Sequence, residues 1–222
     1  MKYIQTKLAF VVSTLLCCVL FSSTAAADHH EWHSLFDGRT LMGWQSNPEN
    51  PESFSIEDGA IKVKGERSHL FYVGTVEDAK FQDFELKAKV KTMPKANAGI
   101  YFHTQYQKEG WPSVGYECQV NTSHGDPRKT GSLYAIDDVD AERLAETGAK
   151  DGEWFDYYIR VYGKQVTIKI NGKELVTYTQ PQDAKRDSSM KGRIIKSGTF
   201  ALQAHDPGST VYFKDILVRP LR

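Results

Sequence analysis

The stretch FDYYIRVYGKQVTIKINGKELV, residues 155–176, decides the fold class. Apolar side chains alternate with polar ones in two runs, which is the period of a half-buried β-strand. Gly163-Lys164 separates these runs, and Asn171-Gly172 ends the second one before the chain turns apolar again. Asn-Gly favours the positive φ angles that a two-residue hairpin turn requires. The stretch therefore predicts three antiparallel strands joined by two tight turns.

The same alternation recurs along most of the chain. Residues 84–90 place apolar side chains on one side and Glu or Lys on the other, and Asp58-Gly59 marks another tight hairpin. Helical periodicity is scarce, and its best candidate is residues 139–147, with Asp140 as the N-cap. Many short strands with hardly any helix predict an all-β fold, namely an antiparallel β-sandwich or jelly roll.

The start of the chain has the pattern of a signal peptide at residues 1–27. A short basic segment precedes an apolar run at residues 8–21, and a small-residue cleavage site ends at Ala27. The run is shorter than the roughly 20 apolar residues that a membrane-spanning helix needs, which favours a cleaved leader over an anchor. We therefore expect a secreted or periplasmic protein with no transmembrane segment after cleavage. Residues 28–222 are long enough for one β-sandwich domain with a full core.

Charge and cysteine content exclude several classes of function. The chain has 28 basic and 28 acidic residues, and this neutrality argues against nucleic acid as the main partner. Cys17 and Cys18 fall in the leader, so Cys118 has no partner for an intrachain disulfide. We expect Cys118 to be a small buried hydrophobe rather than a nucleophile. The chain has no nucleophile elbow, zinc-type Cys/His spacing, phosphate loop or EF-hand loop.

Three strand-like segments, residues 98–104, 115–121 and 200–206, carry unusual polar side chains. If they are neighbouring strands, alternation brings six of these side chains to one surface: Tyr101, His103, Glu117, Gln119, Gln203 and His205. Amides and carboxylates bind sugar hydroxyls, and aromatic rings stack on the apolar face of a sugar. The alternative is an ordinary solvated sheet face, although such a face is usually rich in Lys, Glu and Thr.

Loops are expected to border this surface. Residues 121–138 are rich in Gly, Asp, His and Arg, and His124, Asp126, Arg128 and Tyr134 are placed to reach over a sheet face from there. The alternative for each of them is a solvent-exposed turn. Polar stretches at residues 105–113 and 179–192 are also expected to be loops.

Several motifs together resemble the 3-keto-disaccharide hydrolase domain family, in matching order over nearly the whole chain after the leader. They are SLFDGRTL-x-GW at 34–44, NAGIYF at 97–102, GYECQV at 115–120, GSLY at 131–134, GEW at 152–154, NG at 171–172, LQAH at 202–205 and FKDI at 213–216. Two positions depart from the family pattern. Asn121 stands where the family usually has aspartate, and Phe155 stands where it commonly has asparagine.

The resemblance implies a concanavalin A-like jelly roll that acts on oxidised sugars. A ketone at C3 acidifies the hydrogen at C2, so a base can remove it and the C1 substituent is then expelled. This elimination needs a general base, a group that stabilises the enolate oxygen and an acid at the leaving oxygen. Water then adds back, so the net reaction is hydrolysis of a 3-keto-glycoside. The family resemblance also leaves open a divalent metal at the enolate.

The residues divide into two expected groups. The candidate catalytic residues are Glu117, His205 and His124, of which Glu117 or His205 is the expected base. The candidate substrate-binding residues are Gln119, Gln203, Tyr101, His103, Arg128 and Tyr134. Because one fold serves different functions, a non-catalytic carbohydrate-binding module is the alternative to an enzyme.

Overall fold

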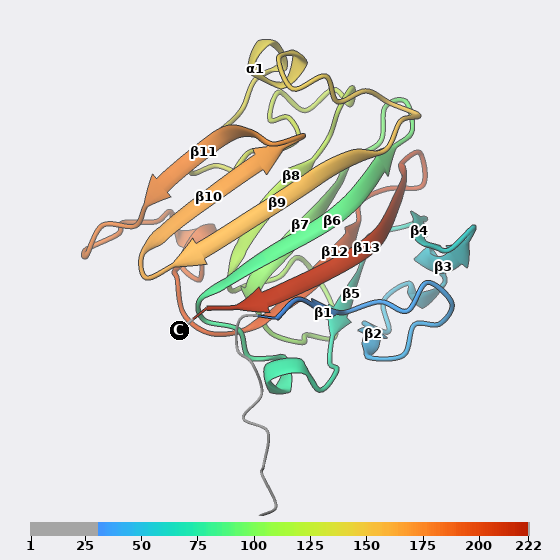
Figure 1. Cartoon of the computed structure of the whole chain (residues 1–222), viewed down its shortest axis with the longest axis horizontal. Coiled ribbons are helices and arrows are strands. Elements are labelled where there is room, and N and C mark those ends of the chain that lie inside the picture. Colours follow the sequence, from blue (N-terminus) through green and yellow to red (C-terminus); the bar gives the residue numbers. More distant parts are fainter. Residues whose placement is uncertain (1–30, 222) are drawn as a thin grey trace, which may run out of the picture.

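The computed structural model describes residues 31–221, which form two antiparallel β-sheets (Figure 1). The strands of the large sheet are β1 (His33–Ser34), β3 (Phe54–Glu57), β4 (Ala60–Lys64), β6 (Phe84–Thr92), β9 (Phe155–Tyr162), β10 (Gln165–Ile170), β11 (Lys173–Thr179) and β13 (Thr210–Pro220). The strands of the small sheet are β2 (Trp44–Ser46), β5 (Ser68–Tyr72), β7 (Ala98–Thr104), β8 (Tyr116–Val120) and β12 (Thr199–Ala204). The expected antiparallel sandwich is confirmed. The expected signal peptide lies outside the described residues.

The strand order brings distant parts of the sequence together. The strand order of the large sheet is β11-β10-β9-β6-β13-β4-β3, and β1 pairs with β13. The first five strands of this order lie side by side in Figure 1. The small sheet runs β2-β5-β12-β7-β8. The three segments that carry the candidate site are therefore adjacent strands, which is the condition for their polar side chains to share one surface. No helix within residues 31–221 is long and apolar enough to cross a membrane.

Two of the three predicted hairpin turns have positive φ angles at both central residues, as their sequences favour. Asp58 and Gly59 join β3 to β4 with φ angles of 50° and 74°. Asn171 and Gly172 join β10 to β11 with φ angles of 49° and 79°. Positive φ at both central residues gives the turn a twist that matches the flanking strands.

The facing sides of the two sheets form one hydrophobic core. Phe84 from the large sheet packs against Phe200 from the small sheet, with ring centres 4.9 Å apart. Cys118 is fully buried in this core, and burial raises the pKa of its thiol well above the usual value. The thiol is therefore neutral and enclosed, in agreement with the prediction that Cys118 is not a nucleophile.

The single α-helix of the described residues is α1 (Ala141–Ala145), and it is shorter than the predicted helix. Asp140 caps it as predicted, because its side chain accepts a hydrogen bond from the Arg143 backbone N–H at 2.9 Å. Three short 3-10 helices, at Pro51–Ser53, Val76–Ala79 and Ser188–Met190, lie in connecting segments.

Candidate active site

A cleft of about 470 Å³ lies on the outer face of the small sheet. Its floor combines Tyr101 from β7, Glu117 and Gln119 from β8, and Gln203 from β12. These side chains alternate with core residues such as Cys118 and so point away from the large sheet. Three loops form its walls and contribute, among others, Trp111, Asp126, Arg128, Tyr134 and Arg193.

Glu117 is the buried acid of the cleft floor, with an exposed fraction of 5%. Its Oε1 accepts a hydrogen bond of 3.0 Å from Gln203 Nε2, and its Oε2 lies 3.7 Å from an Arg193 guanidinium nitrogen. Burial raises the pKa of Glu117, although Arg193, Tyr101 and Gln203 each act to lower it. A raised pKa favours the protonated carboxyl group, which can donate a proton and, once ionised, accept one.

Gly99 of β7 provides the space that Glu117 occupies. A Cβ atom at Gly99 would lie 2.8 Å from Glu117 Oε1 and 3.1 Å from its Cγ. No real side chain tolerates such a contact without movement of its neighbour. The glycine therefore allows the acid to lie flat against the floor of the cleft.

Three amide oxygens that line the cleft are buried without a hydrogen-bond partner: Asn97 Oδ1, Gln119 Oε1 and Gln203 Oε1. An unpaired buried acceptor costs about 1–3 kcal/mol, so these oxygens are suited to a ligand that brings donors. The amide group of Gln203 is oriented from its other end, because Nε2 donates to Glu117 and also to the Tyr101 hydroxyl at 3.1 Å. Sugar hydroxyls are donors of the kind that this floor can accept.

His205 forms a pair with Asp206 at one end of the cleft. Their atoms Nδ1 and Oδ2 are 2.8 Å apart. Burial acts to raise the pKa of Asp206, but hydrogen bonds from Ser209, His205 and the Gly208 backbone lower it overall. The ionised carboxylate can only accept, so Nδ1 carries the proton and Nε2 has a lone pair available to act as a base. Trp111 lies beside the imidazole, with ring centres 5.4 Å apart.

His124 lies next to His205 but does not line the cleft. The centres of the two imidazole rings are 5.8 Å apart. His124 Nδ1 accepts a hydrogen bond of 3.0 Å from the backbone N–H of Asp126. This contact assigns the proton of the neutral ring to Nε2. The position suits a residue that holds His205 in place rather than one that reacts with substrate.

Cationic and aromatic groups also gather around Tyr134 in the wall of the cleft. The guanidinium carbons of Arg128 and Arg193 lie 4.6 and 5.1 Å from the centre of the Tyr134 ring. Arg128 is also held by Asp138 through a hydrogen bond of 3.0 Å. Arg193 donates a hydrogen bond to the backbone carbonyl of Tyr134. The two arginines and the tyrosine hydroxyl can stabilise negative charge that develops on a bound ligand.

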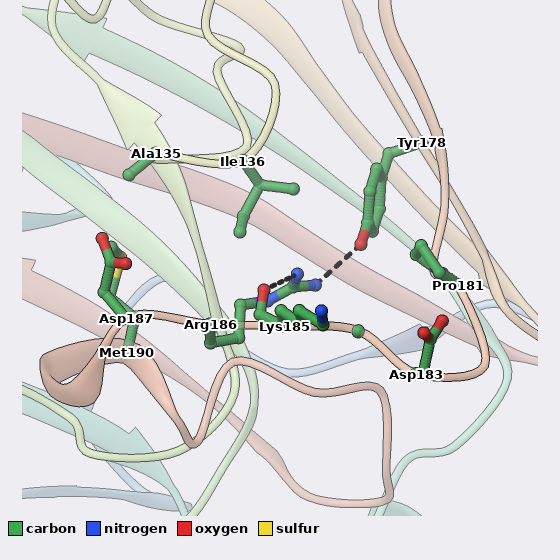
Figure 2. A pocket seen from close by; sticks show the side chains of 10 residues that line it. Ala135, Ile136, Tyr178, Pro181, Asp183, Lys185, Arg186, Asp187 and Met190 are labelled. Atoms are coloured by element: carbon green, nitrogen blue, oxygen red, sulfur yellow. Dashed lines mark hydrogen bonds between the residues drawn. The ribbon is translucent and has the colours of Figure 1, made fainter.

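Arg193 is held by a network around Arg186, which lies in the same loop. The Arg186 side chain donates hydrogen bonds to the Tyr116 hydroxyl at 2.9 Å, the Tyr178 hydroxyl at 2.7 Å and the Arg193 carbonyl at 2.9 Å. Figure 2 shows Arg186 below Tyr178, in a second hollow of about 470 Å³ next to the cleft. The network connects this loop to β8 and β11 and so fixes the backbone from which Arg193 reaches Glu117.

His103 does not reach the cleft, unlike its predicted position beside Tyr101. Its φ angle is 55°, and the pairing of β7 with β12 shifts register at this point. The bulge turns the imidazole toward the edge of the core, where Nε2 donates to the Gln82 carbonyl at 2.8 Å. Burial lowers the pKa of His103 to about 4. Strict alternation failed here because a β-bulge re-aims the side chain.

The two positions that depart from the family pattern have structural roles here. Asn121 is fully buried, and its Nδ2 donates to the backbone carbonyls of Asp126 and Arg128 at 3.0 and 2.8 Å. An aspartate has no such donor, so the amide suits this loop conformation. Phe155 is a core residue. Asn121 therefore supports the loop behind the cleft and supplies no charge to it.

Sequence analysis missed three further residues of the site region: Trp111, Arg193 and His69. Trp111 and Arg193 lie in loops, where no periodic pattern marks a side chain as functional. His69 of β5 is fully buried beneath Trp111, with ring centres 5.6 Å apart, and neither of its ring nitrogens has a partner. Burial lowers the pKa of His69 to about 3. Its pairing with Gln203 across β5 and β12 marks it as part of the same sheet face.

A divalent metal requires several hard or imidazole ligands around one point. Among residues 31–221, no three His, Cys, Asp or Glu side chains come together in such a group. The acids and imidazoles of the cleft are instead paired with Arg193, Asp206 or backbone groups. We therefore derive no chemical step through a metal.

Comparison with known proteins agrees with this geometry. The family model of the 3-keto-alpha-glucoside-1,2-lyase-like domain matches residues 31–219. The chain belongs to this family. No curated protein matches the chain.

Solved structures with the same fold include a predicted glycosyl hydrolase, a carbohydrate-binding module and a protein of unknown function. A predicted glycosyl hydrolase from Parabacteroides distasonis ATCC 8503 superimposes with a TM-score of 0.71 at 22% identity, covering 86% of this chain and 94% of that one. The carbohydrate-binding module CBM66 from Bacillus subtilis has a TM-score of 0.52 at 10% identity, covering 80% and 95%. A Bacillus subtilis protein with a galectin-like fold has a TM-score of 0.52 at 11% identity, covering 86% and 94%. At these identities the likeness is one of fold, and it agrees with the expected jelly roll.

Proposed function

We propose that this member of the family cleaves 3-keto-glycosides by removing the C2 proton and then expelling the C1 substituent. His205 Nε2 takes the C2 proton, and the C2–H electron pair forms the enolate that extends to the C3 oxygen. Asp206 supports this step because it holds Nδ1 and stabilises the imidazolium that forms. The carbonyl then re-forms at C3, a double bond forms between C1 and C2, and the C1–O bond breaks.

Glu117 supplies the acid for the second half of this elimination. Its raised pKa favours the protonated carboxyl group, which can donate to the leaving oxygen as the bond breaks. Arg193, Arg128 and Tyr134 provide positive charge and a donor for the enolate oxygen. Water can then add across the double bond, with Glu117 accepting a proton from water and His205 returning one to C2. The net products are the 3-keto sugar and the free alcohol.

The observation that carries the proposal is the floor of the cleft. One buried carboxyl group lies among amide oxygens that have no partner, while an oriented histidine stands at the same cleft. A glycosidase that works by displacement pairs two carboxylates across the bond. Asp126 is a second carboxylate in this cleft, but its two oxygens already accept hydrogen bonds from the Arg128 backbone N–H and the Tyr134 hydroxyl. We therefore pair Glu117 with the His205 imidazole. Enolate chemistry needs such a pair, because proton removal and leaving-group protonation occur at neighbouring carbons.

The test compares a 3-keto-glucoside with its unoxidised parent, with and without a chelator, and follows release of the alcohol. We expect cleavage of the keto form alone. The His205→Ala and Glu117→Ala variants should each lose at least tenfold in turnover, because general acid–base groups contribute about 10²–10⁴-fold. His124→Ala should lose less, because it does not line the cleft. Unchanged turnover in all three variants would contradict the assignment of roles.

The chelator arm decides whether a metal takes part, because loss of activity with chelator and recovery with a divalent cation would require one. Sugar binding without any cleavage would favour the alternative, a carbohydrate-binding module. We also propose export to the periplasm or the exterior, on the basis of the leader pattern at residues 1–27. Fractionation of cells that express the full chain, with mass measurement of the mature N-terminus, tests export independently.

A further inference from the structure

The outer face of the large sheet, on the opposite side from the cleft, collects positive charge. On β6, Leu86, Ala88 and Val90 point into the core, so the alternating Lys87, Lys89 and Lys91 point outward. The neighbouring strands add further cations to this face: Lys62 from β4 and Lys214 and Arg219 from β13. We call this surface, made of these six residues, the basic face. It is a local accumulation, because the whole chain has a formal net charge of zero.

The basic face includes a charge arrangement that costs stability. Lys89 of β6 lies directly opposite Lys214 of β13, and like charges in such a pair repel. Asp156 neutralises Lys89 through an ion pair of 2.7 Å, and Glu57 and Glu85 pair with Lys62 and Arg219 in the same way. No ion pair within residues 31–221 involves Lys87, Lys91 or Lys214. Three ammonium groups on adjacent strands are therefore available to an anionic ligand.

Aromatic rings lie between these cations. Lys91 and Lys214 lie over the Trp154 ring, at 4.9 and 4.4 Å from its centre. Lys87 and Arg219 lie over the Trp32 ring in the same way, at 4.1 and 4.9 Å. The rings hold the cations in place and add flat apolar surface between them. Both tryptophans are only partly buried.

A shallow groove of about 510 Å³ runs into the same face. Lys87, Lys89 and Lys169 line it together with the Tyr158 ring, and Asp156 and Asp215 add hydrogen-bond acceptors. Lys169 and Lys87 flank Tyr158 across three neighbouring strands. The groove thus repeats the combination of ammonium groups and an aromatic ring.

We propose that the basic face binds an acidic polysaccharide, a polymer of sugar rings that bear carboxylate or sulfate groups. Lysines attract such groups as point charges, and Trp or Tyr rings pack against the apolar face of a pyranose. The cations extend over adjacent strands of one sheet, which suits an extended polymer. Because the cleft lies on the other sheet, binding here leaves it open to substrate.

The test measures binding of polygalacturonate, with neutral dextran as the control polymer, by calorimetry at low and at moderate salt. We expect binding of polygalacturonate alone, with clearly weaker affinity at the higher salt concentration. The triple variant Lys87→Glu, Lys91→Glu, Lys214→Glu should bind at least tenfold more weakly. A second triple with glutamine at the same positions should show the same direction with a smaller loss.

The matched control is Lys80→Glu, Lys191→Glu, Lys196→Glu, which makes the same change in net charge at exposed lysines in connecting segments outside the large sheet. It should keep wild-type binding. Equal losses in the two glutamate triples would refute the basic face as the site. Equally tight binding of dextran, of duplex DNA or of anionic vesicles would refute the proposed class of ligand. Cleavage of a 3-keto-glucoside is measured on the same variants, so failure of the proposed reaction is recognised separately.

Discussion

Replacing Gly99 with alanine tests whether the space beside Glu117 matters for the reaction. The new methyl group would lie 2.8 Å from Oε1, and ordinary contact begins near 3.4 Å. The carboxylate must therefore move by about 0.6 Å within a close-packed floor. Overpacking of this kind costs about 1–3 kcal/mol. The Gly→Ala change offsets about 0.4–1 kcal/mol of this cost, because alanine reduces the conformational entropy of the unfolded chain. We expect a net loss of about 1–2 kcal/mol in the free energy of unfolding.

Turnover should fall further than stability suggests. A misplacement of roughly 1 Å can cost about 100-fold in rate, so a smaller shift of the Glu117 carboxyl should cost about 10-fold or more. The assay is kcat/KM on a 3-keto-glucoside, together with urea unfolding of four proteins: wild type, Gly99→Ala, Glu117→Ala and the double variant. In the Glu117→Ala background the clashing atoms are absent, so Gly99→Ala should be neutral or stabilising.

The double-mutant cycle therefore predicts a coupling of about 1–3 kcal/mol between the two positions. If the two changes are additive in unfolding free energy, the contact between Gly99 and Glu117 does not exist in solution. If Gly99→Ala keeps full kcat/KM while it destabilises the fold, the position of the carboxyl group is not important for the reaction. Either result would refute the reasoning.

Three further predictions concern charge and position. Because burial raises the pKa of Glu117, the protonated carboxyl stabilises the fold fully below pH 4.5, and this contribution is lost as the pH rises through the folded-state pKa. In urea unfolding between pH 4 and 8, the Glu117→Gln variant should therefore not show this loss of stability. Parallel plots of unfolding free energy against pH for the variant and the wild type would contradict this prediction. The contribution of His69 to stability depends on pH in the opposite direction. Because its folded-state pKa is about 3, this contribution is fully present above pH 6.5 and is lost as the pH falls. His69→Phe should lose less stability than wild type between pH 7 and 4, and an unchanged pH dependence would show that His69 is not desolvated. Arg186→Lys should lower kcat/KM about 10-fold by releasing Arg193, since small misplacements in a site are costly. It should also move the alkaline limb of the pH–rate profile upward, because that limb reports ionisation of the acid Glu117, whose pKa Arg193 lowers. A fall in rate with an unmoved limb would assign Arg186 a structural role alone.

Most of the fold could be predicted because the patterns that specify its strands and turns lie within short stretches of the sequence. Alternation identified the strands of residues 155–176, and Asp58-Gly59 and Asn171-Gly172 marked turns that the structure confirms. The floor of the cleft was predictable for the same reason, because two-residue periodicity assigns Glu117, Gln119 and Gln203 to one face. Adjacency of their strands followed only if the polar face was shared, and the strand order confirms that it is.

The rest depended on geometry that no local pattern encodes. His103 sits at a bulge, and alternation cannot signal where a strand gains an extra residue. Arg193 and Trp111 lie in loops, where the sequence has no period to read. Arg193 reaches Glu117 only because Arg186 bridges two tyrosines from separate strands, which is a purely three-dimensional relation. The motif resemblance located the family, but it did not locate these supporting residues.

The strand order of the small sheet also sets when the cleft can appear during folding. β12 pairs between β5 and β7, yet it leaves the ribosome long after both. Until β12 arrives, β7 and β8 present an unpaired edge, and Tyr101 and Glu117 lack Gln203 as a neighbour. Such non-local pairing is slow, and the intermediates that precede it are prone to aggregate through their unpaired strand edges. The cleft is thus among the last features to assemble, so a chain shortened from its C-terminal end loses the site before it loses most of its strands.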